Sequence, residues 1–221
     1  SWQRQLDGRR TAVDMVGYYE GLAASGDETA ARLVEELPIN WRGGPEQPWL
    51  GVWFADEQHG FVVGAFNLML ETRDGGRNWT PWTHRVDNPD ALHLNAVERI
   101  GSALYMPSER GVVFRKREGE ERFSLLQTEY SGSFFGICGD ERLLLAYGLR
   151  GTVYASQDQG ASWSALPPTL PVALTACART AEGRFLLAAA SGHLVDVGLD
   201  QNGVNSALVD GAPWPLAGIA V

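Results

Sequence analysis

Two carboxylates stand in matching surroundings and are the first candidates for chemistry in this sequence. Asp74 and Asp158 each occupy the third position of the pattern S/T-x-D-x-G-x-x-W. A carboxylate can serve as a metal ligand or a general base, but one per repeat supplies neither a ligand set nor an acid–base pair. The residue types favour a structural turn, because the carboxylate accepts backbone N–H groups, glycine permits positive φ and tryptophan anchors a core. The residues expected in these two turns are Thr72, Asp74, Gly76, Trp79, Ser156, Asp158, Gly160 and Trp163.

No other arrangement in the sequence predicts catalysis. A sialidase-type glycoside hydrolase needs an arginine cluster and a Tyr–Glu nucleophile pair, and Glu129-Tyr130 is the nearest candidate. Adjacent residues of a strand point to opposite faces, so this pair is not expected to meet one substrate. The histidines have no ligand-like spacing, at His59, His84, His93 and His193. We predict no catalytic residue, no metal site and no cofactor, and we keep a carbohydrate-active protein, hydrolase or glycan binder, as the alternative.

The two turns belong to a longer repeat. Turn residues at the same offset before each copy, Asn67, Gly111, Gly151 and Gly192, are separated by 44, 40 and 41 residues. Such periods are typical of four-stranded β-propeller blades. The second copy has decayed to Glu118 and Phe123 at the Asp and Trp positions. The fourth has lost the Asp and carries Val204 in place of Trp.

The repeat predicts an all-β fold, a single partial propeller domain over residues 1–221. Each period holds four short apolar runs bounded by Gly, Asp or Pro turns. Ser1-Trp2 matches the end of the turn motif, so we expect partial blades at both ends and an arc of a larger ring. The four complete blades are expected at about 49–85, 92–127, 133–166 and 172–209, with the first strand of a further blade at 215–221.

A long insertion between blades, residues 8–48, predicts two helices. Thr11-Ala12-Val13-Asp14 resembles a capping box, and apolar residues follow at helical spacing. Ser25-Gly26-Asp27 then separates this stretch from a second apolar stripe. Either the two stripes pack on each other and on the propeller rim, or the insertion is a lid or a docking element for a partner.

Two arginines predict a cationic patch on one face of the propeller. Arg110 and Arg150 each precede a repeat anchor, in a turn between second and third strands. Blade topology places these turns with the blade connections, opposite the Asp-bearing turns. Arginine binds carboxylates bidentately, so we expect this face to contact an acidic segment of a protein partner. The full set of predicted partner-binding residues is Arg110, Arg150, Tyr130, Trp41 and Trp49.

Composition excludes several classes of function. The chain has 27 acidic and 18 basic residues, a formal net charge of −9, so nucleic acid is not an expected partner. No apolar run is long enough for a transmembrane segment. Cys138 and Cys177 lie in apolar stretches and are expected as buried free thiols, although a disulfide is the alternative.

The stretch from Gly51 to Gly64, followed by Asp74-Gly75-Gly76 and Trp79, resembles a known family. It is similar to the photosystem II stability/assembly factor-like family of Asp-box (BNR) repeat β-propellers, closely over residues 50–82 and more weakly to about 209. The resemblance implies a seven-bladed, non-enzymatic scaffold, exported to a lumen or periplasm, that binds other proteins during assembly of membrane complexes. It also implies that the Asp boxes, as the two intact turns are called hereafter, are structural.

Overall fold

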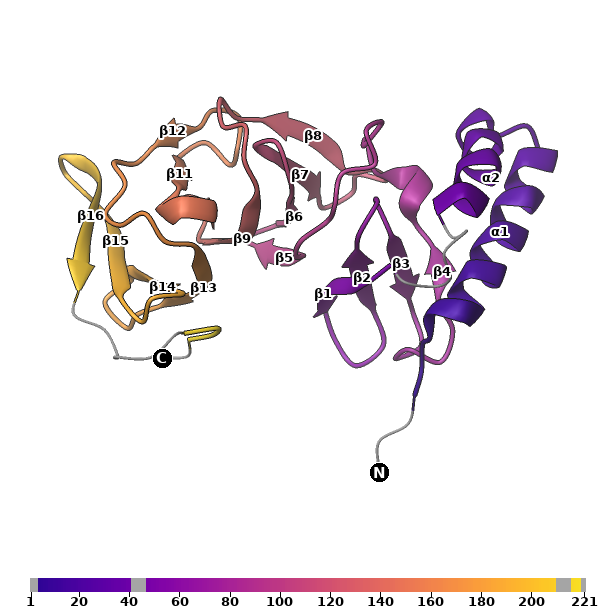
Figure 1. Cartoon of the computed structure of the whole chain (residues 1–221), viewed down its shortest axis with the longest axis horizontal. Coiled ribbons are helices and arrows are strands. Elements are labelled where there is room, and N and C mark those ends of the chain that lie inside the picture. The colour runs from indigo at the N-terminus through magenta and orange to yellow at the C-terminus, as the bar shows by residue number, and fades with distance from the viewer. Residues whose placement is uncertain (1–3, 41–46, 210–215, 220–221) are drawn as a thin grey trace. The chain divides into compact units, whose positions relative to one another are not determined.

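The computed structural model describes residues 4–40, 47–209 and 216–219. Its strands form four separate four-stranded antiparallel sheets, and in each sheet the strands follow one another in chain order (Figure 1). The predicted all-β fold with four complete blades and two helices is confirmed. The chain divides into two compact units, residues 1–97 and 98–221, which are described in turn.

The first unit carries both helices and one sheet. A 3-10 turn, Thr83–Arg85, follows the last strand of the sheet. The helices are α1 (Gly8–Ala24) and α2 (Glu28–Asn40), and the strands are β1 (Trp49–Phe54), β2 (Gly60–Gly64), β3 (Met69–Thr72) and β4 (Thr80–Pro81).

Short polar side chains set the limits of the helices. The first helix begins at Gly8 and not at Thr11, as the sequence pattern predicted, because Asp7 is its N-cap and accepts a 3.0 Å hydrogen bond from the backbone N–H of Arg10. Thr11 is buried in the first turn, and its hydroxyl donates to the carbonyl of Asp7. The predicted break is confirmed: Gly26 has a φ of 96°, and Asp27 caps α2.

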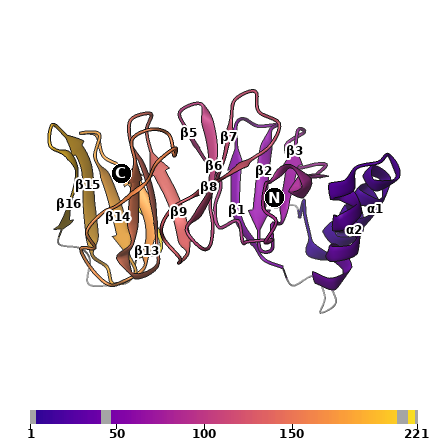
Figure 2. The same cartoon turned by 90° about the horizontal axis from the view of Figure 1, so that it is seen from above.

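The two helices lie side by side and cover one face of the β1–β4 sheet (Figure 2). Tyr19 of α1 is fully buried, and its hydroxyl lies 3.4 Å from Nδ1 of His84. Burial raises the pKa of Tyr19, which keeps the phenol neutral. The helices thus pack against the sheet face through an apolar cluster that includes Met15, Tyr19, Ala30, Leu37, Val62, Leu68 and Leu70.

The second unit holds three sheets. The first comprises β5 (Glu98–Ile100), β6 (Ala103–Pro107), β7 (Val112–Arg117) and β8 (Ser124–Gln127). The next comprises β9 (Phe134–Gly139), β10 (Leu144–Gly148), β11 (Val153–Ser156) and β12 (Ser164–Ala165), with a 3-10 turn at Leu149–Gly151. The last comprises β13 (Leu174–Arg179), β14 (Phe185–Ala189), β15 (Leu194–Asp200) and β16 (Gly203–Val209).

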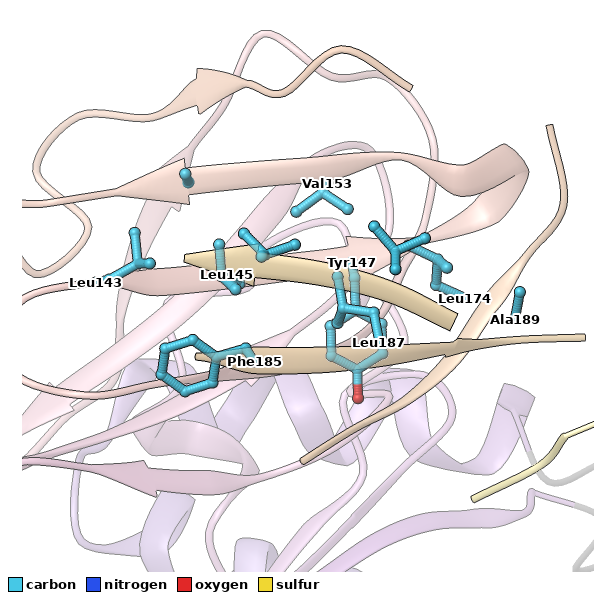
Figure 3. Packing of buried hydrophobic residues seen from close by; sticks show 11 residues of the cluster. Leu143, Leu145, Tyr147, Val153, Leu174, Phe185, Leu187 and Ala189 are labelled. Atoms are coloured by element: carbon cyan, nitrogen blue, oxygen red, sulfur yellow. The ribbon is translucent and has the colours of Figure 1, made fainter. Parts of the chain in front are cut away.

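Two apolar cores join these three sheets face to face. Ile100, Tyr105 and Val113 of the β5–β8 sheet pack with Phe134 and Ile137 of the next sheet. On its other face that sheet packs against β13–β16, as Figure 3 shows for Leu145, Tyr147, Leu174, Phe185 and Leu187. Alternate residues of one strand therefore point into two different cores, as the twofold period of a strand requires.

The cysteines form a disulfide, which corrects the expectation of free thiols. Cys138 on β9 and Cys177 on β13 are bonded, with their Cα atoms 6.3 Å apart. Both lie at the border of the core between the two sheets, and neither is fully buried. The apolar stretches in which they occur predict burial, but the two strands lie close enough for the sulfur atoms to form a bond.

Beyond β16 the structure describes residues 216–219, which lie in the segment expected to begin a further blade. These four residues are not in a helix or strand. The hydroxyl of Thr175 on β13 donates a 2.7 Å hydrogen bond to the carbonyl of Leu216. The rest of 215–221 lies outside the described residues.

Candidate functional site

The candidate site is built on two equivalent turns of the second unit, between β6 and β7 and between β10 and β11. Arg110 and Arg150 are exposed at the tips of these turns with φ values of 53° and 59°. Residues other than glycine rarely adopt this left-handed backbone conformation, because it costs them about 1–2 kcal/mol. Gly111 and Gly151 follow with φ values of 70° and 74°, and a Cβ at either would collide with a neighbouring carbonyl oxygen. The turns therefore need glycine at one position and hold arginine at the strained position before it.

One connection between sheets binds both turns. The backbone N–H of Gly111 donates to the carbonyl of Gly132 at 2.8 Å, and its carbonyl accepts from the backbone N–H of Thr128 at 3.0 Å. In the same connection, Ser133 accepts a 3.2 Å hydrogen bond from the backbone N–H of Leu149. Residues 128–133 thus tie the Arg110 turn to the Arg150 turn, so both arginines lie on one side of the second unit.

Tyr130 lies within this connection and contributes a ring to the same region. Its ring is half-buried against Phe134 and Tyr154, with centroid distances of 5.1 and 5.8 Å. Its hydroxyl donates a 3.4 Å hydrogen bond to the carbonyl of Leu149. The ring therefore supports the turn that carries Arg150.

Two exposed apolar side chains, not predicted from the sequence, belong to the same region. Leu149 precedes Arg150 in its turn and is 40% exposed, and Phe135 near the start of β9 is also 40% exposed. Gly148 pairs with Phe134 in the ladder, which brings the β10–β11 turn beside this end of β9. Phe135 follows the buried Phe134, so strand alternation could have identified it as the outward residue.

Neither of the two predicted tryptophans belongs to the second unit, which begins at residue 98. Trp49 begins β1 in the first unit and packs, half-buried, with the cluster beneath the helices. Trp41 lies outside the described residues. The candidate site of the second unit consists of Arg110, Tyr130, Phe135, Leu149 and Arg150.

Each Asp box begins at the last residue of the third strand of its sheet, at the end away from the turn that precedes that strand. The side chains of each Asp box form hydrogen bonds within the motif. Thr72 Oγ1 donates to Asp74 at 3.0 Å and accepts from the backbone N–H of Gly76 at 2.8 Å. Asp74 also accepts a 2.8 Å hydrogen bond from the backbone N–H of Asn78, and this contact lowers its pKa. The carboxylate thus closes a turn and is occupied by partners of its own motif.

The second Asp box repeats this pattern with different residues. Ser156 donates to Asp158 at 2.8 Å and accepts from the backbone N–H of Gly160 at 2.7 Å. The hydroxyl and the backbone N–H of Ser162 lower the pKa of Asp158 to about 2. Among the described residues, no group of three or more His, Cys, Asp or Glu side chains could hold a metal ion.

Comparison with known proteins identifies the family. The model of the family described as photosynthesis system II assembly factor YCF48 matches residues 43–197. The chain belongs to this family. The family expected from the Asp-box pattern is thus confirmed.

Individual relatives of the YCF48 family cover the chain in part. The photosystem II assembly lipoprotein Ycf48 of Synechococcus sp. (strain CC9902) is 26% identical over 148 residues, 65% of this chain and 44% of that protein. The chain therefore spans less than half the length of this relative. A solved structure of YCF48 bound to D1 peptide aligns with a TM-score of 0.55 and 23% identity, over 72% of this chain and 55% of that one.

The YCF48 family match also decides between the scaffold and the hydrolase alternative. A GH74 enzyme of Niastella koreensis aligns with a TM-score of 0.51 but 11% identity, over 72% of this chain and 30% of that one, a likeness of fold alone. Tyr130 donates its hydroxyl to a backbone carbonyl. The chain belongs to a family of assembly factors, and the glycoside hydrolase alternative is not favoured.

Proposed function

We propose that this protein is a non-enzymatic propeller scaffold that binds an acidic segment of another protein, a component of a membrane complex, at the Arg110 and Arg150 turns. The observation that carries the proposal is the left-handed backbone at both arginines. A glycine would relieve this strain, yet each turn presents a long cationic side chain. Strain retained at equivalent exposed positions of two consecutive sheets is typical of a binding site.

The chemistry of the site supports an acidic partner. A guanidinium group offers a planar fork of donors that matches a carboxylate, so two of them fit a segment with acidic side chains. Leu149 and Phe135 add exposed apolar surface beside the arginines. The expected ligand therefore combines carboxylates with apolar side chains along an extended backbone.

The relatives support a protein ligand in an exported setting. One related structure is described as bound to D1 peptide, and the relative from Synechococcus is named an assembly lipoprotein. The disulfide supports folding in an oxidising compartment, where such bonds persist. No helix within the described residues has the length and hydrophobicity needed to cross a membrane. We infer export to a periplasm or lumen.

The test measures the affinity for an acidic peptide by fluorescence anisotropy. The probe is a short labelled peptide of Glu, Asp and Leu residues, titrated at low salt with the wild type and with the double variant Arg110→Ala, Arg150→Ala. We expect a loss of affinity on the order of tenfold and an unchanged Tm, because alanine keeps the same Cβ on the same backbone. Equal affinities of the wild type and this variant would contradict the proposal.

Two further variants separate the site from net charge and from stability. The double variant Arg122→Ala, Arg142→Ala removes the same charge from exposed turns at the other ends of the strands, and it should bind like the wild type. The double variant Arg110→Gly, Arg150→Gly should lose affinity while its Tm stays level or rises, because glycine relieves the left-handed strain. Equal losses in both charge-matched variants would indicate non-specific attraction.

A further inference from the structure

The Cys138–Cys177 disulfide links two sheets that share no hydrogen-bonded ladder. Cys138 lies on β9 and Cys177 on β13, each the first strand of its own sheet. The two cysteines are separated by 39 residues, nearly one repeat, which explains why they occupy corresponding strands of consecutive sheets. The bond is therefore a covalent staple between neighbouring sheets of the second unit.

Solvent can reach this staple in the folded protein. Both cysteines are half-buried and line a cavity of about 210 Å³. Glu98 and Arg99 of β5, both exposed, border the same cavity, so its wall is charged and open to water. A small thiol can therefore approach the sulfur atoms without unfolding either sheet.

The apolar core beneath the bond is built mainly from residues other than the cysteines. Cys138 pairs with Leu145 in its ladder, and Cys177 pairs with Leu187 in the next sheet. Both leucines are fully buried in the apolar core between the two sheets (Figure 3). Because these buried leucines do not take part in the bond, we expect reduction to weaken the junction and to leave the fold intact.

We propose that the Cys138–Cys177 disulfide is a reversible redox site, opened in the native protein by a dithiol reductant and tightening the junction between the β9–β12 and β13–β16 sheets when closed. A thiolate of the dithiol attacks one cysteine sulfur, which forms a mixed disulfide and releases the other cysteine as a thiolate. The second thiolate of the dithiol then attacks the dithiol sulfur of the mixed disulfide and releases the first cysteine. Two electrons and two protons pass to Cys138 and Cys177, which become thiols, while the dithiol becomes a disulfide. The inference stands apart from the acidic-peptide site and does not require it.

The experiment uses dithiothreitol as the dithiol and no denaturant. The protein is incubated with dithiothreitol and alkylated with N-ethylmaleimide, and its intact mass is measured by mass spectrometry. We expect both thiols to be labelled, an unchanged far-ultraviolet circular dichroism spectrum, and a Tm lower by roughly 5–10 °C, because an open loop regains chain entropy in the unfolded state. Labelling that appears only in denaturant, loss of the fold on reduction, or an unchanged Tm would each overturn the proposal.

A matched variant shows whether a change in Tm comes from opening the disulfide or from another effect of dithiothreitol. The double substitution Cys138→Ala, Cys177→Ala should fold, melt near the Tm of the reduced wild type and not respond to dithiothreitol. Limited proteolysis should cut within 174–209 faster in this variant and in the reduced protein than in the oxidised one. A variant that melts with the oxidised wild type would contradict the claim that the bond tightens the junction.

Discussion

The sheets with an Asp box and the sheets without one close their last hairpin in different ways. In the two sheets that retain the motif, the fourth strand is only two residues long, Thr80–Pro81 and Ser164–Ala165. In the sheets where the motif has decayed, the fourth strand has four residues, Ser124–Gln127, or seven, Gly203–Val209. The Asp box thus replaces ladder pairing with hydrogen bonds inside the turn, and lost Asp boxes coincide with longer ladders.

In the decayed turns, the carboxylate that accepts a backbone N–H does not stand at the Asp position of the motif. In the β7–β8 turn, Glu120 accepts a 2.8 Å hydrogen bond from the backbone N–H of Arg117, whereas Glu118 occupies the expected Asp position. In the β15–β16 turn, Asp200 accepts a 2.7 Å hydrogen bond from the backbone N–H of Asn202. A nearby carboxylate therefore caps each turn, while the ladder holds the strands.

The largest predicted loss of stability comes from removing the buried aromatic anchor of a sheet without an Asp box. Phe123 replaces the motif's tryptophan and is fully buried, whereas Trp163 in an intact Asp box is only partly buried. Phe123→Ala should lower the free energy of unfolding by about 3–4 kcal/mol, and Trp163→Ala by about 2 kcal/mol, because the exposed part of its ring loses no packing. Urea denaturation measures both, and the reverse order would contradict this view of the anchors.

A smaller effect tests the glycines of the two turn types. Gly160 in an Asp box has a φ of 87°, and an added Cβ would lie 2.7 Å from Leu126 Cδ1. Gly203 begins β16 with a φ of 105° and has open space around it. Gly160→Ala should cost about 2 kcal/mol and Gly203→Ala about 1 kcal/mol, since both strain the backbone but only the first also clashes. Equal losses in thermal denaturation would show that crowding inside the Asp box is unimportant.

The smallest effect concerns pH and sharpens the role of the carboxylate. Hydrogen bonds lower the pKa of Asp158 from 3.8 to about 2 on folding, so its stabilisation is present above pH 3.8 and is lost as pH falls toward 2. The wild type should exceed Asp158→Asn in unfolding free energy at neutral pH, and the difference should shrink between about pH 5 and pH 2. A difference that is constant with pH would contradict the charged hydrogen bonds.

Much of the fold could be predicted from sequence, because the Asp box has rigid chemical requirements. A hydroxyl, a carboxylate, a glycine and a tryptophan at fixed spacing can form one kind of turn, and their recurrence gives the length of a blade. The pair Arg110 and Arg150 followed from the same frame. The start of α1 was predicted at the wrong residue, because two nearby side chains could cap the helix. Asp7 is the N-cap, ahead of Thr11.

The remaining features depend on the distance between strands that are remote in sequence. The disulfide required β9 and β13 to lie side by side, and local hydrophobicity around Cys138 and Cys177 pointed instead to burial. A spacing of 39 residues, close to the repeat length, was the available signal. Phe135 and Leu149 became part of the candidate site only when ladder register placed the β10–β11 turn beside the start of β9.

Nuclear magnetic resonance can distinguish binding at the arginine turns from binding at the Asp boxes. Backbone amide shifts of the isotope-labelled protein would be followed while the acidic peptide is added. We expect the largest shift changes within residues 109–112, 128–135 and 148–152, and no change at the amides of 72–79 and 156–163. Changes concentrated in the Asp boxes, or spread evenly over the chain, would contradict binding at the arginine turns.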